Sequence, residues 1–143
     1  MATQGVKATL QRLFDDQQEW PEVLAGIATG TPAWLDIANT FHAVADGASS
    51  EQLESAVGEA LEHHPTNVLS IAVPNFALEA VCTSPDVDDP RFDSYDLSIA
   101  AIERREAKLR LVRKPTLVAL RDSCIAELEK AKGYAAQYYG RSP

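Results

Sequence analysis

The sequence predicts an all-α protein, a single compact bundle of about seven helices, in which consecutive helices could stack as pairs. Apolar residues recur every three or four positions through most of the chain, as they do on the inner face of a helix. Proline and glycine stand between these periodic stretches, where helices begin and end. Strand signals are almost absent, with no strict alternation of apolar and polar residues and no Asn-Gly hairpin turn.

The stretch 49–73 shows the helical pattern most clearly, and we expect the rest of the chain to be organised around it. Ser49, followed three residues later by Gln52, matches a capping box and predicts that a helix begins there. Pro65 then begins a second, mostly apolar helix. The apolar face of the first of these helices is formed by Leu53, Ala56, Val57, Ala60 and Leu61.

Three helices are expected before this stretch. The first covers residues 4–16, the second ends at Gly30, and the third begins at Thr31-Pro32. Proline is tolerated in the first turn of a helix, where its missing N–H costs no hydrogen bond, and glycine is favoured just beyond the last turn.

Further helices are expected after the central stretch. A short one follows Asn75, which can cap it, and residues 83–94 lack any periodicity and form the longest predicted loop. Two long helices follow this loop, the first from Asp93 to about Val112 and the second from Thr116.

The composition fits one folded domain that covers residues 1–143. Hydrophobic residues make up 45% and charged residues 24%, which is ordinary for a globular protein and argues against disorder. No apolar run reaches the length of a membrane span, and the first residues lack the apolar core of a secretory signal. The protein is therefore cytoplasmic, or a leader has been removed from it.

Charge is distributed unevenly along the chain, whose formal net charge is -8. Residues 1–90 hold 14 acidic residues and only Lys7 and Arg12 as bases, whereas residues 91–143 hold 7 acidic and 11 basic residues. Such asymmetry indicates either two sites for different partners or two halves that attract each other when folded. Nucleic-acid binding is not expected, since the pI is near 4.8.

The end of the central helix is the first candidate site for chemistry. Glu59, Glu62 and His63 cluster there, and Glu59 and His63 are four residues apart, so they share a helix face and could supply two metal ligands. The HExxH motif of zinc enzymes is missing, and a histidine in a last turn is also favoured by the helix dipole. We therefore expect no metal or cofactor, and keep these residues as the candidates if one is bound.

The acidic stretch Asp86–Asp93 is the second candidate site, with Asp86 and Asp88 as possible cation ligands. Arg91 stands where an EF-hand loop needs glycine, which excludes that type of calcium site. Solvation of the loop and capping of the next helix by Asp93 explain these acids without a ligand.

Two surfaces are candidates for contact with a partner. Positive charges gather in residues 104–114, as a solvated helix face, as a face that docks on the acidic first half, or as a contact for an anionic surface. Two adjacent tyrosines near the C-terminal end are harder to bury on both sides. The candidate contact residues are Arg104, Arg105, Lys108, Tyr138 and Tyr139.

The chain has two cysteines, Cys82 and Cys124, each in apolar helical sequence. Their number and spacing match no zinc site, which needs four ligands. They are either two buried thiols or one disulfide, and a single pair in an otherwise cysteine-free chain suits an exported protein. A bridge across this loop would stabilise the fold by about 4 kcal/mol in the chain-entropy model.

Several segments together resemble a group of small helical proteins from proteobacteria. They are WPEVLAGIATGTPAWLDIA at 20–38, AVGEALEHHPTNVLSI at 56–71, VC at 81–82 and LRDSC at 120–124. In that group the pattern runs through most of the chain and two cysteines lie at the corresponding places. The group has no established activity, and many members are exported. The resemblance implies an all-helical fold and a Cys82–Cys124 bridge, and it carries no catalytic residue.

These observations favour a non-catalytic protein-interaction module of the bacterial envelope, periplasmic or secreted, that binds another protein through its helical surface. An inhibitor or immunity protein that blocks an envelope-degrading toxin is one form of this function. The alternative is a cation-dependent enzyme or binder that uses both acidic candidate sites. A flat surface would favour the interaction module, and a pocket that joins the two sites and perturbs the pKa values of their groups would favour the alternative.

Overall fold

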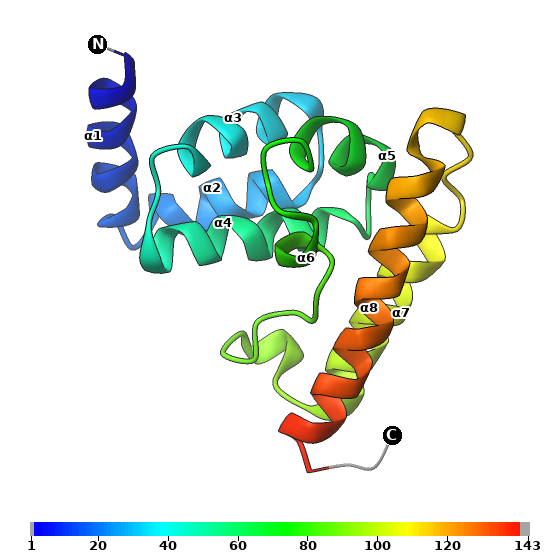
Figure 1. Ribbon diagram of the computed structural model, residues 1–143. Helices are drawn as coiled ribbons and strands as arrows, with labels where there is room; N and C mark the ends of the chain where they lie inside the picture. The colour runs from blue at the N-terminus through cyan, green and yellow to red at the C-terminus, as the bar shows by residue number, and fades with distance from the viewer. Residues whose placement is uncertain (1, 141–143) are drawn as a thin grey trace.

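The computed structural model describes residues 2–140, with side chains from residue 5, and confirms the all-α fold (Figure 1). Eight α-helices and no strand occur in this part of the chain. The α-helices are α1 (Ala2–Phe14), α2 (Glu19–Ala28), α3 (Pro32–His42), α4 (Gly47–Ala60), α5 (Pro65–Asn67), α6 (Leu78–Val81), α7 (Tyr95–Leu109) and α8 (Val118–Tyr138). Three shorter helical turns are η1 (Val68–Ala72), η2 (Pro90–Phe92) and η3 (Pro115–Leu117).

Helix α4 lies at the centre of the fold and carries the predicted apolar face. Leu53, Val57 and Ala60 are fully buried in the core. Helices α2, α3 and α6 and the turn η1 all pack against α4 (Figure 1). The burial of this face therefore holds together segments from residue 19 to residue 81.

The predicted capping box at the start of α4 is wrong. The helix begins at Gly47, two residues earlier, with Asp46 as its N-cap residue. The hydroxyl of Ser49 donates to the backbone carbonyl of Asp46, and the side chain of Gln52 accepts the indole N–H of Trp20 at 2.7 Å. Gln52 thus joins α4 to α2. It does not complete a capping box, because the indole N–H of Trp20 takes its side-chain oxygen.

Two other predicted helix starts also differ from the structure. Helix α7 is capped by Ser94, whose hydroxyl accepts the backbone N–H of Leu97, and not by Asp93. Helix α6 begins at Leu78 and does not use Asn75 as its cap. The glycine predicted beyond α2 is confirmed, since Gly30 has a φ of 77°, a conformation that favours glycine.

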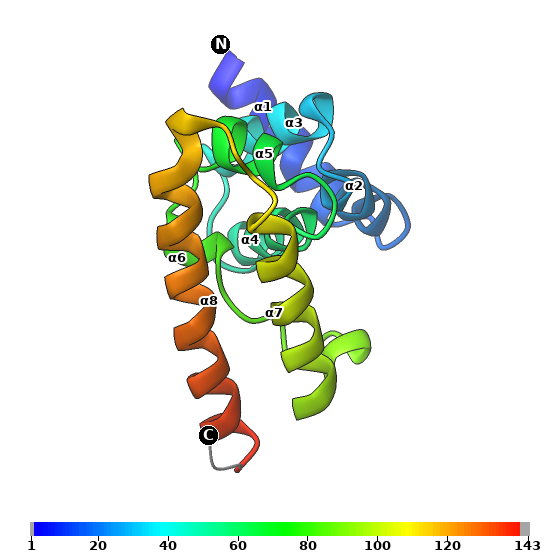
Figure 2. The ribbon, with the colours of Figure 1, turned by 90° about the vertical axis from the view of Figure 1, so that its right-hand side faces the viewer.

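Helices α7 and α8 form an antiparallel hairpin that packs beside the other helices (Figures 1 and 2). A disulfide between Cys82 and Cys124 joins the end of α6 to α8, which confirms the bridge. Both cysteines are almost completely buried. None of the helices in the described residues has the length and apolar character that a membrane span requires.

The hairpin also contains a buried carboxylate, Glu106 of α7. Its side chain is 2% exposed and forms an ion pair with Lys132 of α8, with 3.0 Å between Oε1 of Glu106 and Nζ of Lys132. Burial, together with the nearby Glu129, raises the pKa of Glu106 above its usual range, and Lys132 opposes this effect. The ion pair therefore adds a contact between α8 and α7, whereas the disulfide joins α8 covalently to the end of α6.

Helices α4 and α6 approach each other closely at Gly58. A Cβ atom at this position would lie 2.9 Å from the backbone oxygen of Val81 and 3.3 Å from Nη1 of Arg105. Only glycine fits here without displacement, since the nearest atom belongs to the backbone. Because Cys82 follows Val81 directly, this contact sets where the disulfide and the next loop begin.

Breaking the Cys82–Cys124 bridge is expected to lower the free energy of unfolding by about 4 kcal/mol. The bridge joins residues 42 positions apart and therefore restricts the unfolded chain over a long loop. Urea unfolding of the oxidised and the fully reduced protein measures the difference. The Cys82→Ala/Cys124→Ala variant serves as a control that reductant should not affect. Equal midpoints for oxidised and reduced wild type would contradict this expectation.

Gly58→Ala is expected to destabilise the protein by about 1–3 kcal/mol, because the added methyl group collides with the backbone of α6. Gly133→Ala is the matched control, since a Cβ there meets nothing within 4 Å and α8 continues through this position. Alanine should stabilise that helix by about 0.5–1 kcal/mol. Urea unfolding measures both changes, and equal stability of the two variants would rule out a tight contact at Gly58.

Candidate functional site

A cleft of about 630 Å³ lies between α2, α4 and residues 83–94, which we call the cleft loop. In Figure 1, α4 lies between α2 and this loop. The volume is within the range of about 300–1,000 Å³ that ligand pockets occupy. Helix α2 contributes mainly apolar side chains and the loop mainly charged ones. The lining residues on this side are Pro21, Leu24, Ala25 and Ala28 of α2 and Thr29, which follows it.

The cleft loop is shaped by its own aspartates and prolines. The carboxylate of Asp86 accepts the backbone N–H of Asp88 at 2.9 Å, and that of Asp89 accepts the backbone N–H of Arg91 at 3.0 Å. Asp89 thereby caps the turn η2. Phe92 is buried at the end of this turn and anchors the loop to the rest of the protein.

Arg91 fastens the cleft loop to α4. Its Nη1 and Nη2 atoms donate to both carboxylate oxygens of Glu59 at 3.0 and 2.8 Å. Its Nε and Nη2 atoms also donate to Asp89 at 3.2 and 2.8 Å. Hydrogen bonds from Arg91 lower the pKa of Asp89, and the carboxylates of Glu59 and Asp89 raise the pKa of Arg91. Arg91 and Asp89 are therefore fixed charges at neutral pH.

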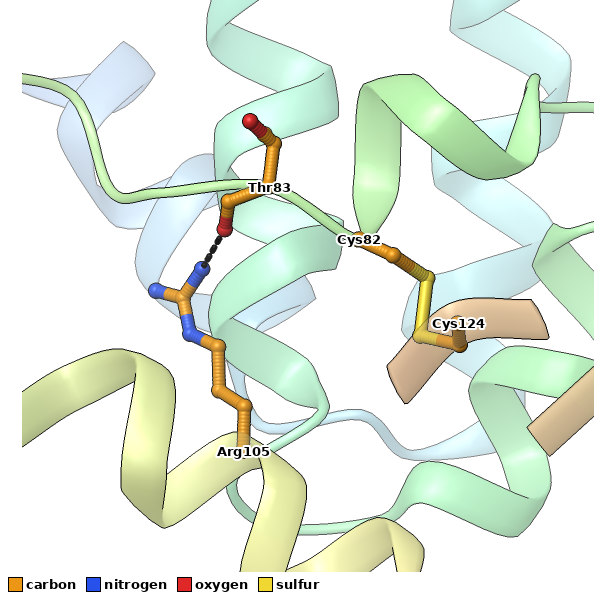
Figure 3. Close-up of a disulfide and its surroundings, with 4 residues drawn as sticks. All are labelled: Cys82, Thr83, Arg105 and Cys124. Carbon is orange, nitrogen blue, oxygen red and sulfur yellow. Dashed lines mark hydrogen bonds between the residues drawn. A yellow bond between two sulfur atoms is a disulfide. The ribbon is translucent and has the colours of Figure 1, made fainter. Parts of the chain in front are cut away.

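Arg105 contributes to the cleft from α7 and is buried, with only 2% of its surface exposed. Its Nε donates to Glu62 at 3.1 Å, and its Nη1 donates to the carbonyl of Thr83 at 3.2 Å (Figure 3). Burial lowers the pKa of the guanidinium, and the Glu62 carboxylate opposes this shift. The expectation that Arg105 belongs to a surface with Arg104 and Lys108 is wrong, because its side chain is buried, with Nη1 close to Gly58 of α4. Arg104 is exposed and pairs with the same Glu62 at 2.7 Å.

The cleft brings together the two candidate sites that the sequence analysis treated separately. The predicted residues that line it are Glu59, His63, Asp86 and Asp88. Glu62 does not line it, because it is occupied by the two arginines of α7. Nowhere in the part of the chain that the structure describes do three His, Cys, Asp or Glu side chains form a group that could hold a metal.

Sequence reasoning missed the apolar side of the cleft and the role of Arg91. Leu24 fits the inner face of α2 by its spacing, yet it is only partly buried and lines the cleft. The partner of Arg91 on α4 is 32 residues away in the chain, so no local pattern indicates the ion pair. The one available signal was the opposite charge of the two halves.

The two adjacent tyrosines near the C-terminal end differ in exposure. Tyr138 is 66% exposed, whereas Tyr139 is half-buried and donates its hydroxyl to the carbonyl of Phe92. Tyr134, one turn before Tyr138, is also 66% exposed. A contact role for Tyr138 and Tyr139 stays a prediction.

Comparisons of the chain with protein-family models, with curated proteins and with solved structures found no match. The resemblance to a proteobacterial group therefore stays an expectation from the sequence. The function has to be argued from the side chains of the cleft and the bonds between them.

Arg91→Gln is expected to release the cleft loop and to raise the pKa of Asp89 toward its usual range, since Arg91 is the main cause of its lowering. The Arg91 side chain is 60% exposed, so the loss of global stability should stay below about 1 kcal/mol. An NMR pH titration of the Asp89 carboxyl and amide exchange in the loop measure the two local effects.

The matched control for Arg91→Gln is Arg12→Gln, which removes an exposed ion pair with Glu19 elsewhere on the surface. It should leave both measurements unchanged. An Asp89 pKa that is the same in wild type and Arg91→Gln would show that the ion pair does not form in solution.

Proposed function

We propose that this protein is a non-catalytic protein-interaction module of the bacterial envelope, and that it receives part of another protein in the cleft. The observation that carries the proposal is the state of the cleft's side chains. Its arginines are already engaged by carboxylates of the same chain, and its apolar side on α2 has no covering segment among the described residues. A site with paired charges and open apolar side chains is suited to contact the surface of another protein.

The charges of the cleft support binding over catalysis. General acid–base catalysis works best with a group whose pKa lies near the working pH. Here the pKa of Asp89 is lowered and that of Arg91 is raised, so both are held away from neutrality. These groups keep their charge and hold the loop in place.

The disulfide supports a location in the envelope. Disulfides persist in oxidising compartments, which include the bacterial periplasm and the cell exterior, and are rare in the cytoplasm. The Cys82–Cys124 bridge is buried and joins helices that are far apart in the chain. The bridge therefore favours the exported location over the cytoplasmic alternative.

An inhibitor or immunity protein is one form that this function takes. Its partner would be a toxin that degrades the envelope, and the cleft would receive a segment of that toxin. The partner at the cleft is in either case a protein, and its identification decides whether it is a toxin.

Ser55→Trp tests the proposal, because Ser55 is an exposed residue of α4 that lines the cleft. A tryptophan there should block any occupant whatever its charge. Ser123→Trp is the matched control, since Ser123 is exposed on α8 and lies outside the cleft. Immobilised wild type, Ser55→Trp and Ser123→Trp are each incubated with envelope extract from the source organism, and bound proteins are identified by mass spectrometry.

We expect wild type and Ser123→Trp to retain the same protein and Ser55→Trp to lose it. With the purified partner, calorimetry should then show affinity at least roughly tenfold weaker for Ser55→Trp, as for blockage of a central contact. A partner retained equally by all three proteins would place binding outside the cleft and overturn the proposal.

A cation-dependent enzyme or binder is the second candidate, because a pocket that joins the two acidic sites was expected for it, and one cleft is lined by Glu59, His63, Asp86 and Asp88. Against it, Glu59 is held by Arg91 through two hydrogen bonds. Calorimetric titration with Ca²⁺ and Zn²⁺ distinguishes this candidate. Binding that is present in wild type and lost in Asp86→Asn/Asp88→Asn would favour it.

A further inference from the structure

The balance of charge inside the cleft indicates the chemistry of its occupant. Four acidic residues line the cleft, against two arginines. Arg91 is paired with both Glu59 and Asp89, and Arg105 is paired with Glu62. Both positive charges of the cleft are thus neutralised by carboxylates of this chain. The remaining acidic residues are Asp86 and Asp88.

Asp86 and Asp88 have no cationic partner within residues 5–140. Both residues are exposed, and within residues 5–140 the Asp86 carboxylate accepts only the backbone N–H of Asp88. They lie on a loop that is fastened to α4 through Arg91, a few residues further on. Two negative charges are therefore held at the edge of the cleft without compensation.

The opposite side of the cleft is apolar. Pro21 and Ala25 are exposed on α2 and Leu24 is partly buried, and all three line the cleft. A complementary occupant has an apolar portion that lies on α2 and a positive group that reaches the loop. Lysine and arginine side chains combine an apolar stem with a charged head in this way.

We infer that the cleft binds a segment of the partner protein that carries a lysine or arginine next to an apolar residue, with the positive group held by Asp86 and Asp88. This inference rests on the proposed function. An anionic segment would meet these two carboxylates and find no unpaired arginine. The acidic first part of the chain adds to the attraction, because its field draws positive charge toward the cleft.

The test uses three blocked tetrapeptides as probes: acetyl-Ala-Leu-Lys-Ala-amide, the same peptide with norleucine for lysine, and the same peptide with glutamate for lysine. Each is titrated into ¹⁵N-labelled protein and followed by the amide signals of α2 and the cleft loop. The lysine peptide should bind roughly tenfold more tightly than the norleucine peptide, and the glutamate peptide more weakly still. Binding of the lysine peptide should weaken as salt rises from about 50 to 500 mM.

Variants of the protein separate the charge from the cavity. Asp86→Asn/Asp88→Asn should reduce binding of the lysine peptide to the level of the norleucine peptide. Asp36→Asn/Glu103→Gln is the matched control, because it removes two exposed acidic charges that do not line the cleft and should leave binding unchanged. Ser55→Trp should abolish binding of all three peptides.

Each other result overturns the inference in a distinguishable way. Equal binding of the lysine and norleucine peptides, abolished by Ser55→Trp, would reject a cationic occupant and leave the cleft as an interaction site. Tighter binding of the glutamate peptide would point to an anionic partner. No shift with any peptide would also reject the inference, and the envelope-extract experiment with Ser55→Trp would still decide the proposed function.

Discussion

The arrangement of the helices around the cleft depends on the hydrogen bonds of the buried Arg105 guanidinium to Glu62 and to the Thr83 carbonyl. A charge removed from water is tolerated only when it is paired and hydrogen-bonded, so both Glu62 and the Thr83 carbonyl must be in place. These two partners come from the turn that follows α4 and from the start of the cleft loop. The disulfide fixes the same point from the other side, since Cys82 precedes Thr83 and is joined to α8 (Figure 3). Both helices of the hairpin thus hold the beginning of the loop.

The helices could be predicted from the sequence because their apolar faces are local patterns. Leu53 and Val57 follow the spacing of a buried helix face, and they are buried. Arg105 could not be predicted in the same way. It stands in a run of positive residues that resembles a solvated face, and its partner Glu62 is 43 residues away. The cap at Gln52 failed for a related reason, because the indole of Trp20 competes for its side-chain oxygen over a distance of 32 residues.

The uneven charge along the sequence was the one feature that indicated contacts between residues far apart in the chain. It allowed two interpretations, separate partner sites or attraction between the two halves. In the structure, Arg91, Arg104 and Arg105 of the basic half pair with Glu59 and Glu62 of the acidic half. Attraction between the halves is therefore confirmed for these residues. It also explains why the two acidic candidate sites of the sequence meet in one cleft, since Arg91 joins the loop to α4.

The pairing of the two halves leaves some carboxylates without a cationic partner among the described residues, and these determine the charge of the cleft. The first part of the chain has more carboxylates than the arginines of the second part can neutralise, and Asp86 and Asp88 belong to this excess. Their loop is anchored before them by Cys82 and Thr83 and after them by Arg91. Anchoring at both ends limits the freedom that the loop would lose when a partner binds, and smaller losses of this kind favour affinity. A cleft built on this frame can bind through fixed charge and apolar surface alone.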